Sequence, residues 1–223
     1  AFRQRAEVNK HFGGRTEMVD RQQIRELVPS LNLDPGHLPV LAGLWHIDGG
    51  TARHDAVAWG YAKGAAKRGV EIHQLTEVQD LIIENGRITA VKTNRGTIQC
   101  GCAVQAVAGH SSLMAKKAKI EMPIVCYPLQ AMVTQPFKPF LDPLVSSSAL
   151  HCYVQQTGRG EVVFGGGSDP YPLYNTRSTL DLKESLISAA IEMFPFLANA
   201  KLMRQWAGRS EERRVGKECP RCV

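Results

Sequence analysis

Three segments of the chain place apolar residues at helical spacing. Residues 21–31 (RQQIRELVPSL) show the i, i+3, i+4 and i+7 stripe of an amphipathic helix, which Pro29 is expected to end early. A second helix is predicted over 55–68, with Gly69 as its stop signal. Its apolar face consists mostly of small residues, so it can lie close against a sheet. A third helix is predicted over 179–194.

Extended patterns fill the region between the second and third helices. Residues 70–75 alternate apolar and polar side chains, and 103–108 (AVQAVA) reads as a short buried strand that ends at Gly109. Between them, the Asn85-Gly86 dipeptide is a strong hairpin signal. The pattern therefore predicts a strand, a three-stranded meander and a further strand; the meander strands are expected at 78–84, 87–93 and 97–100.

The pattern changes after residue 124. YPLQAMVTQP, ALHCYVQQ and EVVFGGG are β-rich segments separated by prolines and a TGRG turn, so a second, largely antiparallel sheet is expected. Doubly wound sheets that bind a dinucleotide often carry an inserted meander like that of the first region. The expected fold is therefore α/β joined to α+β, with domains at 1–118 and 119–208 and a boundary near 115–123.

Composition narrows the class of protein. The 223 residues hold 27 basic and 21 acidic side chains, but the basic ones are scattered, so nucleic-acid binding is not expected. No apolar run reaches the roughly 18 residues of a membrane span, and the first ten residues lack the apolar part of a signal peptide. We expect a cytoplasmic protein with reduced cysteines, or a chain whose true start is missing. The histidines show no paired spacing for a metal site.

The last 15 residues have a separate interpretation. From Arg209 the run RSEERRVGKEC matches the in-frame translation of a sequencing-library adapter. Residues 209–223 are accordingly interpreted as an adapter-derived artefact tail and set aside from the fold. Two alternatives stay open, a half-site for zinc formed by Cys219 and Cys222, or a disordered charged tail.

The segment GGTARHD places Arg53, His54 and Asp55 where a glycine-rich loop becomes a helix. From the pattern alone, the histidine is an ordinary surface or capping residue. Asp55 reads as a plain N-cap and Arg53 as a solvated charge. The local spacing gives no further reason to select them.

Several longer runs carry a family resemblance. GGTARHDAVAWGYAKGAAKRGVEIHQLTEV, VKTNRGTI, AVAGHSS, MPIVCYPLQAMVTQP and MRQWAG together resemble the beta subunits of heterotetrameric sarcosine oxidases, in the D-amino-acid-oxidase-like FAD-dependent oxidoreductase family. The resemblance covers nearly all of 1–208. It implies a partial FAD-binding domain over 1–118 and a partial substrate domain over 119–208. Members also have a strand, a GxGxxG turn and a helix that hold the FAD pyrophosphate; GxGxxG is absent here, so an internal fragment is expected.

Five residues are predicted to bind a cofactor, four of them through the resemblance and Arg53 through its charge. His54 matches the histidine that holds FMN covalently through the flavin 8α-methyl group, at the interface with the alpha subunit, and Arg53 offers a cation to that flavin. Val78 matches the backbone contact to the adenine of FAD. Ala108 and Gly109 match the place where the chain passes the FAD. An ordinary core strand residue and a tight turn are the plain alternatives for Val78 and Gly109.

Two catalytic candidates are implied for the substrate side. His151 is expected on a strand where related amine oxidases hold the substrate carboxylate, and Tyr153 shares its strand face. A half-buried strand histidine with one hydrogen bond is the alternative.

The implied activity is oxidation of sarcosine to glycine, with electrons passing from FAD to FMN and then to dioxygen, which yields hydrogen peroxide. The one-carbon unit leaves as formaldehyde or passes to tetrahydrofolate on the alpha subunit. The implied partners are the alpha, gamma and delta subunits and a small amino-acid substrate. Other readings are a glycine oxidase, a proline or dimethylglycine dehydrogenase-like enzyme, and an inactive truncated fragment.

Overall fold

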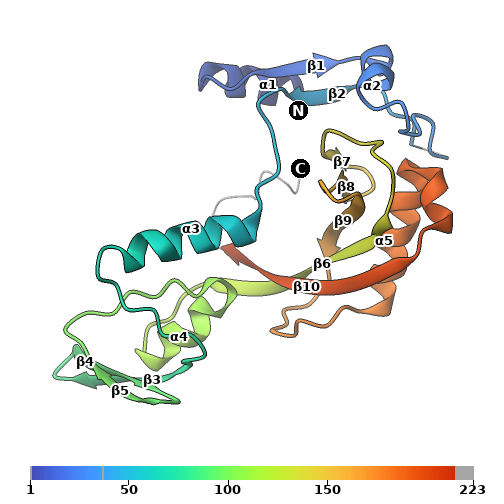
Figure 1. The fold of residues 1–223 in the computed structure, drawn as a ribbon. Helices are drawn as coiled ribbons and strands as arrows, with labels where there is room; N and C mark the ends of the chain where they lie inside the picture. The colour runs from blue at the N-terminus through green and yellow to red at the C-terminus, as the bar shows by residue number, and fades with distance from the viewer. Residues whose placement is uncertain (1, 37, 214–223) are drawn as a thin grey trace. The chain divides into compact units, whose positions relative to one another are not determined.

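A computed structural model describes residues 2–36 and 38–213 of this chain (Figure 1). It contains helices and strands in an order that mixes the two kinds of element. The helices are α1 Phe2–His11, α2 Arg21–Leu27, α3 His54–Ala66, α4 Ser111–Lys117 and α5 Leu180–Met193, with 3-10 turns at Ala108–His110 and Pro195–Asn199. The strands are β1 Thr16–Val19, β2 Gly43–His46, β3 Val78–Glu84, β4 Arg87–Thr93, β5 Gly96–Gln99, β6 Ile124–Pro136, β7 Val145–Ser147, β8 Cys152–Gln156, β9 Glu161–Ser168 and β10 Leu202–Arg213.

The chain divides into two units by its internal contacts. Unit 1 comprises 1–51, 128–171 and 175–208; unit 2 comprises 52–127, 172–174 and the described residues from 209 onward. This grouping differs from the expected division at 115–123, because the first 51 residues pack with the later part of the chain. Val28 is buried in the core cluster that includes α5, and the amide of Asn32 donates to the carbonyl of Met193 at 2.8 Å.

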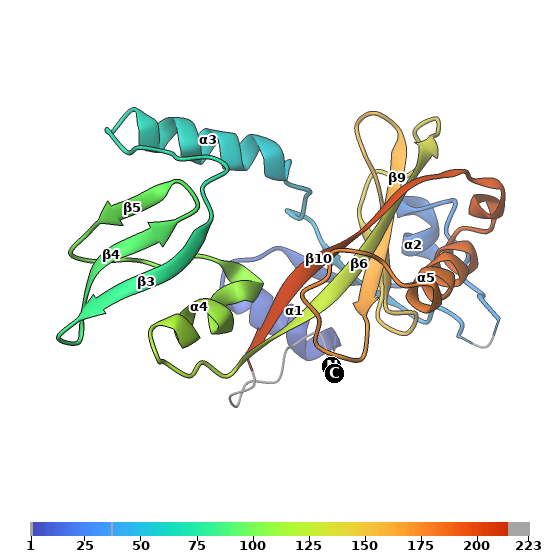
Figure 2. The same cartoon turned by 90° about the horizontal axis from the view of Figure 1, so that it is seen from below.

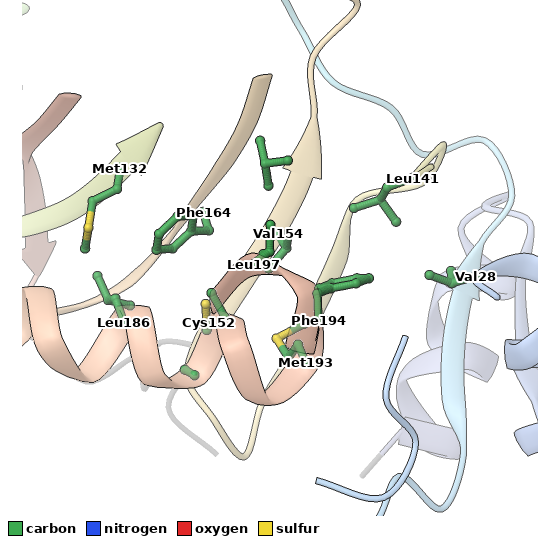
Figure 3. Packing of buried hydrophobic residues seen from close by; sticks show 13 residues of the cluster. Val28, Met132, Leu141, Cys152, Val154, Phe164, Leu186, Met193, Phe194 and Leu197 are labelled. Atoms are coloured by element: carbon green, nitrogen blue, oxygen red, sulfur yellow. The ribbon is translucent and has the colours of Figure 1, made fainter. Parts of the chain in front are cut away.

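Unit 1 contains the main sheet, with the strand order β10-β6-β9-β8-β7. The β6–β9, β9–β8 and β8–β7 pairs are all antiparallel, which confirms the predicted sheet type. Helix α5, predicted over 179–194, packs against β8 and β9 through its apolar face. Figure 3 shows Leu186 of α5 beside Phe164 of β9.

Four phenylalanines close one end of this core. Phe194 is fully buried, and its ring meets those of Phe140 and Phe196 at centroid distances of 5.9 and 6.3 Å, with Phe137 also in edge contact with Phe140 and Phe196. All four contacts are T-shaped, the arrangement that aligns ring edges with ring faces. Large aromatic rings therefore supply much of the packing at the end of α5.

The first 51 residues contain a two-stranded antiparallel sheet, β1–β2, and both α1 and α2 contact β1. Helix α2 begins with a capping box, in which Asp20 accepts from the Gln23 amide at 2.9 Å and the Gln23 side chain accepts from the Asp20 amide. It ends at Leu27, before Pro29, as predicted. Arg15 forms a two-pronged ion pair with Asp48, which ties the ends of β1 and β2 together.

Unit 2 contains the predicted meander, β3-β4-β5, whose strands lie side by side in Figure 2. The structure places β3 and β4 over the predicted residues, and β5 one residue earlier. Asn85 and Gly86 both have positive φ, 51° and 75°, as the two central residues of a type I′ hairpin require. The hairpin signal is therefore confirmed.

Two predicted strands of unit 2 are wrong in this structure. Residues 70–75 and 103–108 are not strands. The second segment, predicted to be buried, is exposed, with Val104 at 89%, and Val70 of the first segment is 54% exposed. Their composition is typical of strands, but a strand needs a neighbour for its backbone hydrogen bonds. Within 2–36 and 38–213, no strand pairs with either segment.

Candidate functional site

Helix α3 begins at His54, within one residue of the start that the GGTARHD segment predicts. Arg53 is the N-cap residue and makes no capping hydrogen bond with its side chain. Asp55 lies inside the first turn, so its interpretation as the N-cap is wrong. Its carboxylate accepts from the Ala56 amide at 2.8 Å and from Arg53 at 3.3 Å. Both hydrogen bonds lower the pKa of Asp55, and the bond from the Ala56 amide has the larger effect.

The ring of His54 is open to solvent. It makes no hydrogen bond or ion pair with any residue in the described part of the chain, and the Arg53 side chain beside it is 82% exposed. A neutral imidazole nitrogen is nucleophilic, and an exposed one can be reached by a large planar group. The site thus presents a reachable nucleophile next to a fixed positive charge, which fits an anionic cofactor with an electrophilic carbon.

Val78 is the first residue of β3 and is half-buried opposite Thr93. The backbone just before it is held by Asn94, whose side-chain oxygen accepts from the Glu77 amide at 2.9 Å and whose amide donates to the Glu77 carbonyl at 3.1 Å. Asn94, which directly follows β4, therefore holds the backbone just before β3 in place. Asn94 was not among the residues selected from the sequence, because its link to Glu77 depends on the register of the meander.

Ala108 and Gly109 form a tight 3-10 turn instead of the end of a strand. Ala108 has a φ of 46°, in the left-handed region that alanine rarely adopts, and Gly109 is buried. The hydroxyl of Ser111 donates to the Ala108 carbonyl at 2.6 Å. Glycine has no Cβ to hold a ligand away from the backbone, so the residue type at position 109 fits the contact to FAD that the resemblance implies.

His151 and Tyr153 do not share a strand face, so this prediction is wrong. His151 is exposed and lies in the turn before β8, with a φ of 47°. Tyr153 is half-buried on the sheet face opposite the core residues Cys152 and Val154, and burial raises its pKa. The cause is the left-handed turn at His151, which removes it from the alternation of the strand.

Glycines 165 and 166 explain how β9 passes these residues. A Cβ at Gly165 would lie 2.6 Å from the Gln130 carbonyl oxygen, and one at Gly166 would collide with the His151 carbonyl oxygen. Gly166 also has a φ of 136°. The GGG run is therefore a place where three strands approach closely, and it serves packing rather than phosphate binding.

The predicted site residues fall into two groups. Unit 2 holds all five cofactor candidates, and unit 1 holds both catalytic candidates. In the described residues, no cluster of three or more His, Cys, Asp or Glu side chains could hold a metal ion. Cys219 and Cys222 lie outside the described residues. None of the described helices has the length and apolar character to cross a membrane.

Comparison with known proteins places this site in context. A family model for FAD dependent oxidoreductases (DAO) matches residues 1–219. Sarcosine oxidase subunit beta of Rhodobacter capsulatus is 42% identical over 193 residues, which are 86% of this chain and 47% of that protein. The Rhizobium meliloti protein of the same name is 41% identical over 93% of this chain and 50% of its own length. The chain thus spans about half the length of these relatives.

Solved structures show the same fold. L-proline dehydrogenase from P. horikoshii superposes with a TM-score of 0.85 at 30% identity, over 93% of this chain and 56% of that one. Glycine oxidase from Bacillus cereus gives a TM-score of 0.79 at 20% identity, over 95% of this chain and 56% of that one, which is a likeness of fold alone. Both matches cover units 1 and 2 together.

Proposed function

Because this chain belongs to the FAD dependent oxidoreductase family, we propose that it is part of the beta subunit of a sarcosine oxidase. The observation that carries the proposal is the 40–42% identity to three sarcosine oxidase beta subunits over 86–93% of the chain. More distant family members are 22–27% identical, so sarcosine oxidase beta is favoured by a wide margin over those relatives.

In the proposed reaction, sarcosine loses two electrons and two protons at its N-methyl C–H and its nitrogen, and the resulting imine is hydrolysed to glycine and formaldehyde. When bound, FAD would supply the redox chemistry by taking up a hydride equivalent, and dioxygen would finally receive the two electrons and two protons as hydrogen peroxide. The alternative fate of the one-carbon unit is transfer to tetrahydrofolate on the alpha subunit. The chain itself supplies binding, orientation and charge.

We assign covalent FMN attachment to His54. The exposed ring and the lack of a competing hydrogen bond within the described residues support this role. Arg53 lies beside it and is already paired with Asp55, which leaves its remaining N–H groups to meet a flavin phosphate. The alpha, gamma and delta subunits are the proposed partners, with the FMN at the interface with alpha.

FAD is assigned to the backbone at Val78, Ala108 and Gly109. Two hydrogen bonds support this assignment. Asn94 accepts from the Glu77 amide just before β3, and the Ser111 hydroxyl donates to the carbonyl of Ala108. Rigid backbone donors and acceptors bind a ligand without first losing conformational freedom. On the substrate side, Tyr153 is the better candidate, because its ring projects from a strand, whereas His151 stands in an exposed turn.

A second candidate is an L-proline dehydrogenase-like enzyme, favoured by the TM-score of 0.85 at 30% identity. The two proposals separate by substrate. The full-length subunit, expressed with its partner subunits, is assayed with sarcosine and with L-proline in turn. Faster flavin reduction by sarcosine supports the first proposal, and faster reduction by L-proline replaces it with the second.

Covalent attachment is tested by denaturing the full-length subunit. Flavin fluorescence is expected to stay with the wild-type polypeptide and to be absent from His54→Ala. The matched control is His73→Ala, which removes another exposed histidine of unit 2 and should keep its flavin. Equal release of flavin from wild type and His54→Ala would contradict the assignment.

The 223-residue chain alone is expected to bind FAD weakly, because its sequence contains no GxGxxG turn for the pyrophosphate. It should also show no sarcosine oxidation. Equilibrium dialysis with FAD measures the binding directly. Tight binding of one FAD per chain would overturn this view of the chain as an inactive part.

A further inference from the structure

The Ala108–Gly109 turn is held by more than its own backbone. Ala108 adopts a left-handed φ of 46° that a non-glycine residue occupies only when its surroundings enforce it. Two local bonds contribute: the His110 amide donates to Val107 at 3.0 Å, and the Ser111 hydroxyl donates to Ala108 at 2.6 Å. Both bonds lie within five residues and move with the turn, so neither anchors it to the rest of unit 2.

A distant residue supplies such an anchor. The imidazole of His110 stacks on the ring of Tyr174, with centroids 5.6 Å apart and planes 30° from parallel. The two residues are far apart in the sequence. Residues 172–174 nevertheless belong to unit 2, whereas the residues on both sides of them belong to unit 1.

Tyr174 is itself firmly placed. The neighbouring Leu173 amide donates to the carbonyl of Cys126 at 3.1 Å, and Cys126 is only 1% exposed at the start of β6. The Tyr174 ring stacks on His110, and the residue as a whole is 37% exposed. The stack therefore joins a strained turn to a buried strand.

We propose that His110 and Tyr174 are positioning residues that hold the Ala108–Gly109 turn in the conformation that receives FAD. The inference rests on the proposed FAD contact at these two residues. Without the stack, the turn can relax from its left-handed conformation, and binding then has to restore it. The cost is expected to appear as weaker FAD affinity, with little change in the rate of the bound enzyme.

Truncation of either ring tests the stack. In the full-length subunit stripped of FAD, Tyr174→Ala and His110→Ala are each expected to weaken FAD binding about three- to tenfold, the range for one aromatic pair. Tyr174→Phe keeps the ring and should rescue the affinity. The double variant should bind FAD no more weakly than either single variant, because both remove the same contact.

Tyr171→Ala is the matched control, since it removes a 48% exposed tyrosine of the same loop that stacks on no other ring in the described residues. Amide hydrogen exchange of residues 107–111 is the second readout, and it should speed up in Tyr174→Ala but not in Tyr171→Ala or Tyr174→Phe. Unchanged FAD affinity and exchange in Tyr174→Ala would overturn the proposal, as would an equal loss in Tyr171→Ala.

The same measurements separate this inference from the proposed function. If sarcosine is oxidised but FAD affinity is unchanged in Tyr174→Ala, the inference fails and the proposed function stands. If FAD affinity follows the stack but sarcosine is not oxidised, the positioning role stands and the substrate assignment fails.

Discussion

Helices α5 and α3 are nearly equal in length, 14 and 13 residues, and each has an apolar face, yet their surroundings differ. Helix α5 buries Leu186, Ala189, Ala190 and Met193 against the main sheet. Helix α3 buries none of its residues, and its Trp59 and Tyr61 are 59% and 79% exposed. An apolar face thus shows that a helix needs a partner surface, and the structure shows whether the described residues provide one.

The same contrast extends to the strands around the two helices. The strands next to α5 each have a neighbour, so their backbone groups are paired. The segments 70–75 and 103–108, which follow α3 in unit 2, have no such neighbour among the described residues. In unit 2, helix α3 and these two segments therefore lack a partner, whereas the meander strands pair with one another. The surface that would cover α3 and the two segments is not formed by the described residues.

The largest expected effect comes from truncating an aromatic ring in each region. Phe194→Ala should lower the free energy of unfolding of unit 1 by about 3–5 kcal/mol, because it empties a fully buried position in contact with two other rings. Trp59→Ala in α3 should change it by less than about 0.5 kcal/mol. Urea unfolding of the 223-residue chain measures both. A large loss in Trp59→Ala would show that α3 packs against a surface after all.

A pair of glycines gives effects of opposite sign. Gly166→Ala should destabilise unit 1 by about 1–3 kcal/mol, because its φ of 136° disfavours a side chain and the new Cβ meets the His151 carbonyl. Gly60→Ala in α3 meets no atom within 4 Å and should stabilise the helix by about 0.5–1 kcal/mol. Thermal unfolding followed by circular dichroism compares them. Destabilisation by Gly60→Ala would mean that a neighbour presses on α3.

The smallest effect concerns two cysteines at alkaline pH. Burial raises the pKa of Cys152 to about 12 from an ordinary value of 9.0, so the unfolded chain loses this proton before the folded chain does. The contribution of the protonated Cys152 thiol to the free energy of unfolding is therefore fully present below pH 9.0 and is lost as the pH rises toward about 12. At pH 10 the free energy of unfolding is expected to be lower by about 1 kcal/mol. Urea unfolding at pH 8 and pH 10 tests this.

The control is Cys152→Ala, in which this part of the pH dependence should vanish. Cys102 of unit 2 is exposed and should react with iodoacetamide at pH 8, while Cys152 in the folded chain should not. Rapid alkylation of Cys152 at pH 8, measured by mass spectrometry, would contradict its burial and the pKa argument together.

Much of the local structure could be predicted because it depends on neighbours in the sequence. The Asn85-Gly86 turn aligns β3 with β4, and Pro29 ends α2, because each acts on the backbone next to it. The start of α3 at His54 follows from the loop before it. The cofactor candidates could be selected only by resemblance, since no local pattern distinguishes His54 from a surface histidine.

The sequence by itself determined the helices α2, α3 and α5, the meander and the antiparallel character of the later sheet, because hydrogen bonds and side-chain periodicity within a few residues define them. Only the tertiary structure decided that residues 1–51 pack with the later part of the chain, that His151 leaves its strand, and that His110 meets Tyr174. These features depend on contacts between distant residues, whose free energy no local pattern contains. The same reason explains why α3 could be predicted but its exposure could not. Its own residues define its apolar face, whereas its burial depends on a partner surface formed by distant residues.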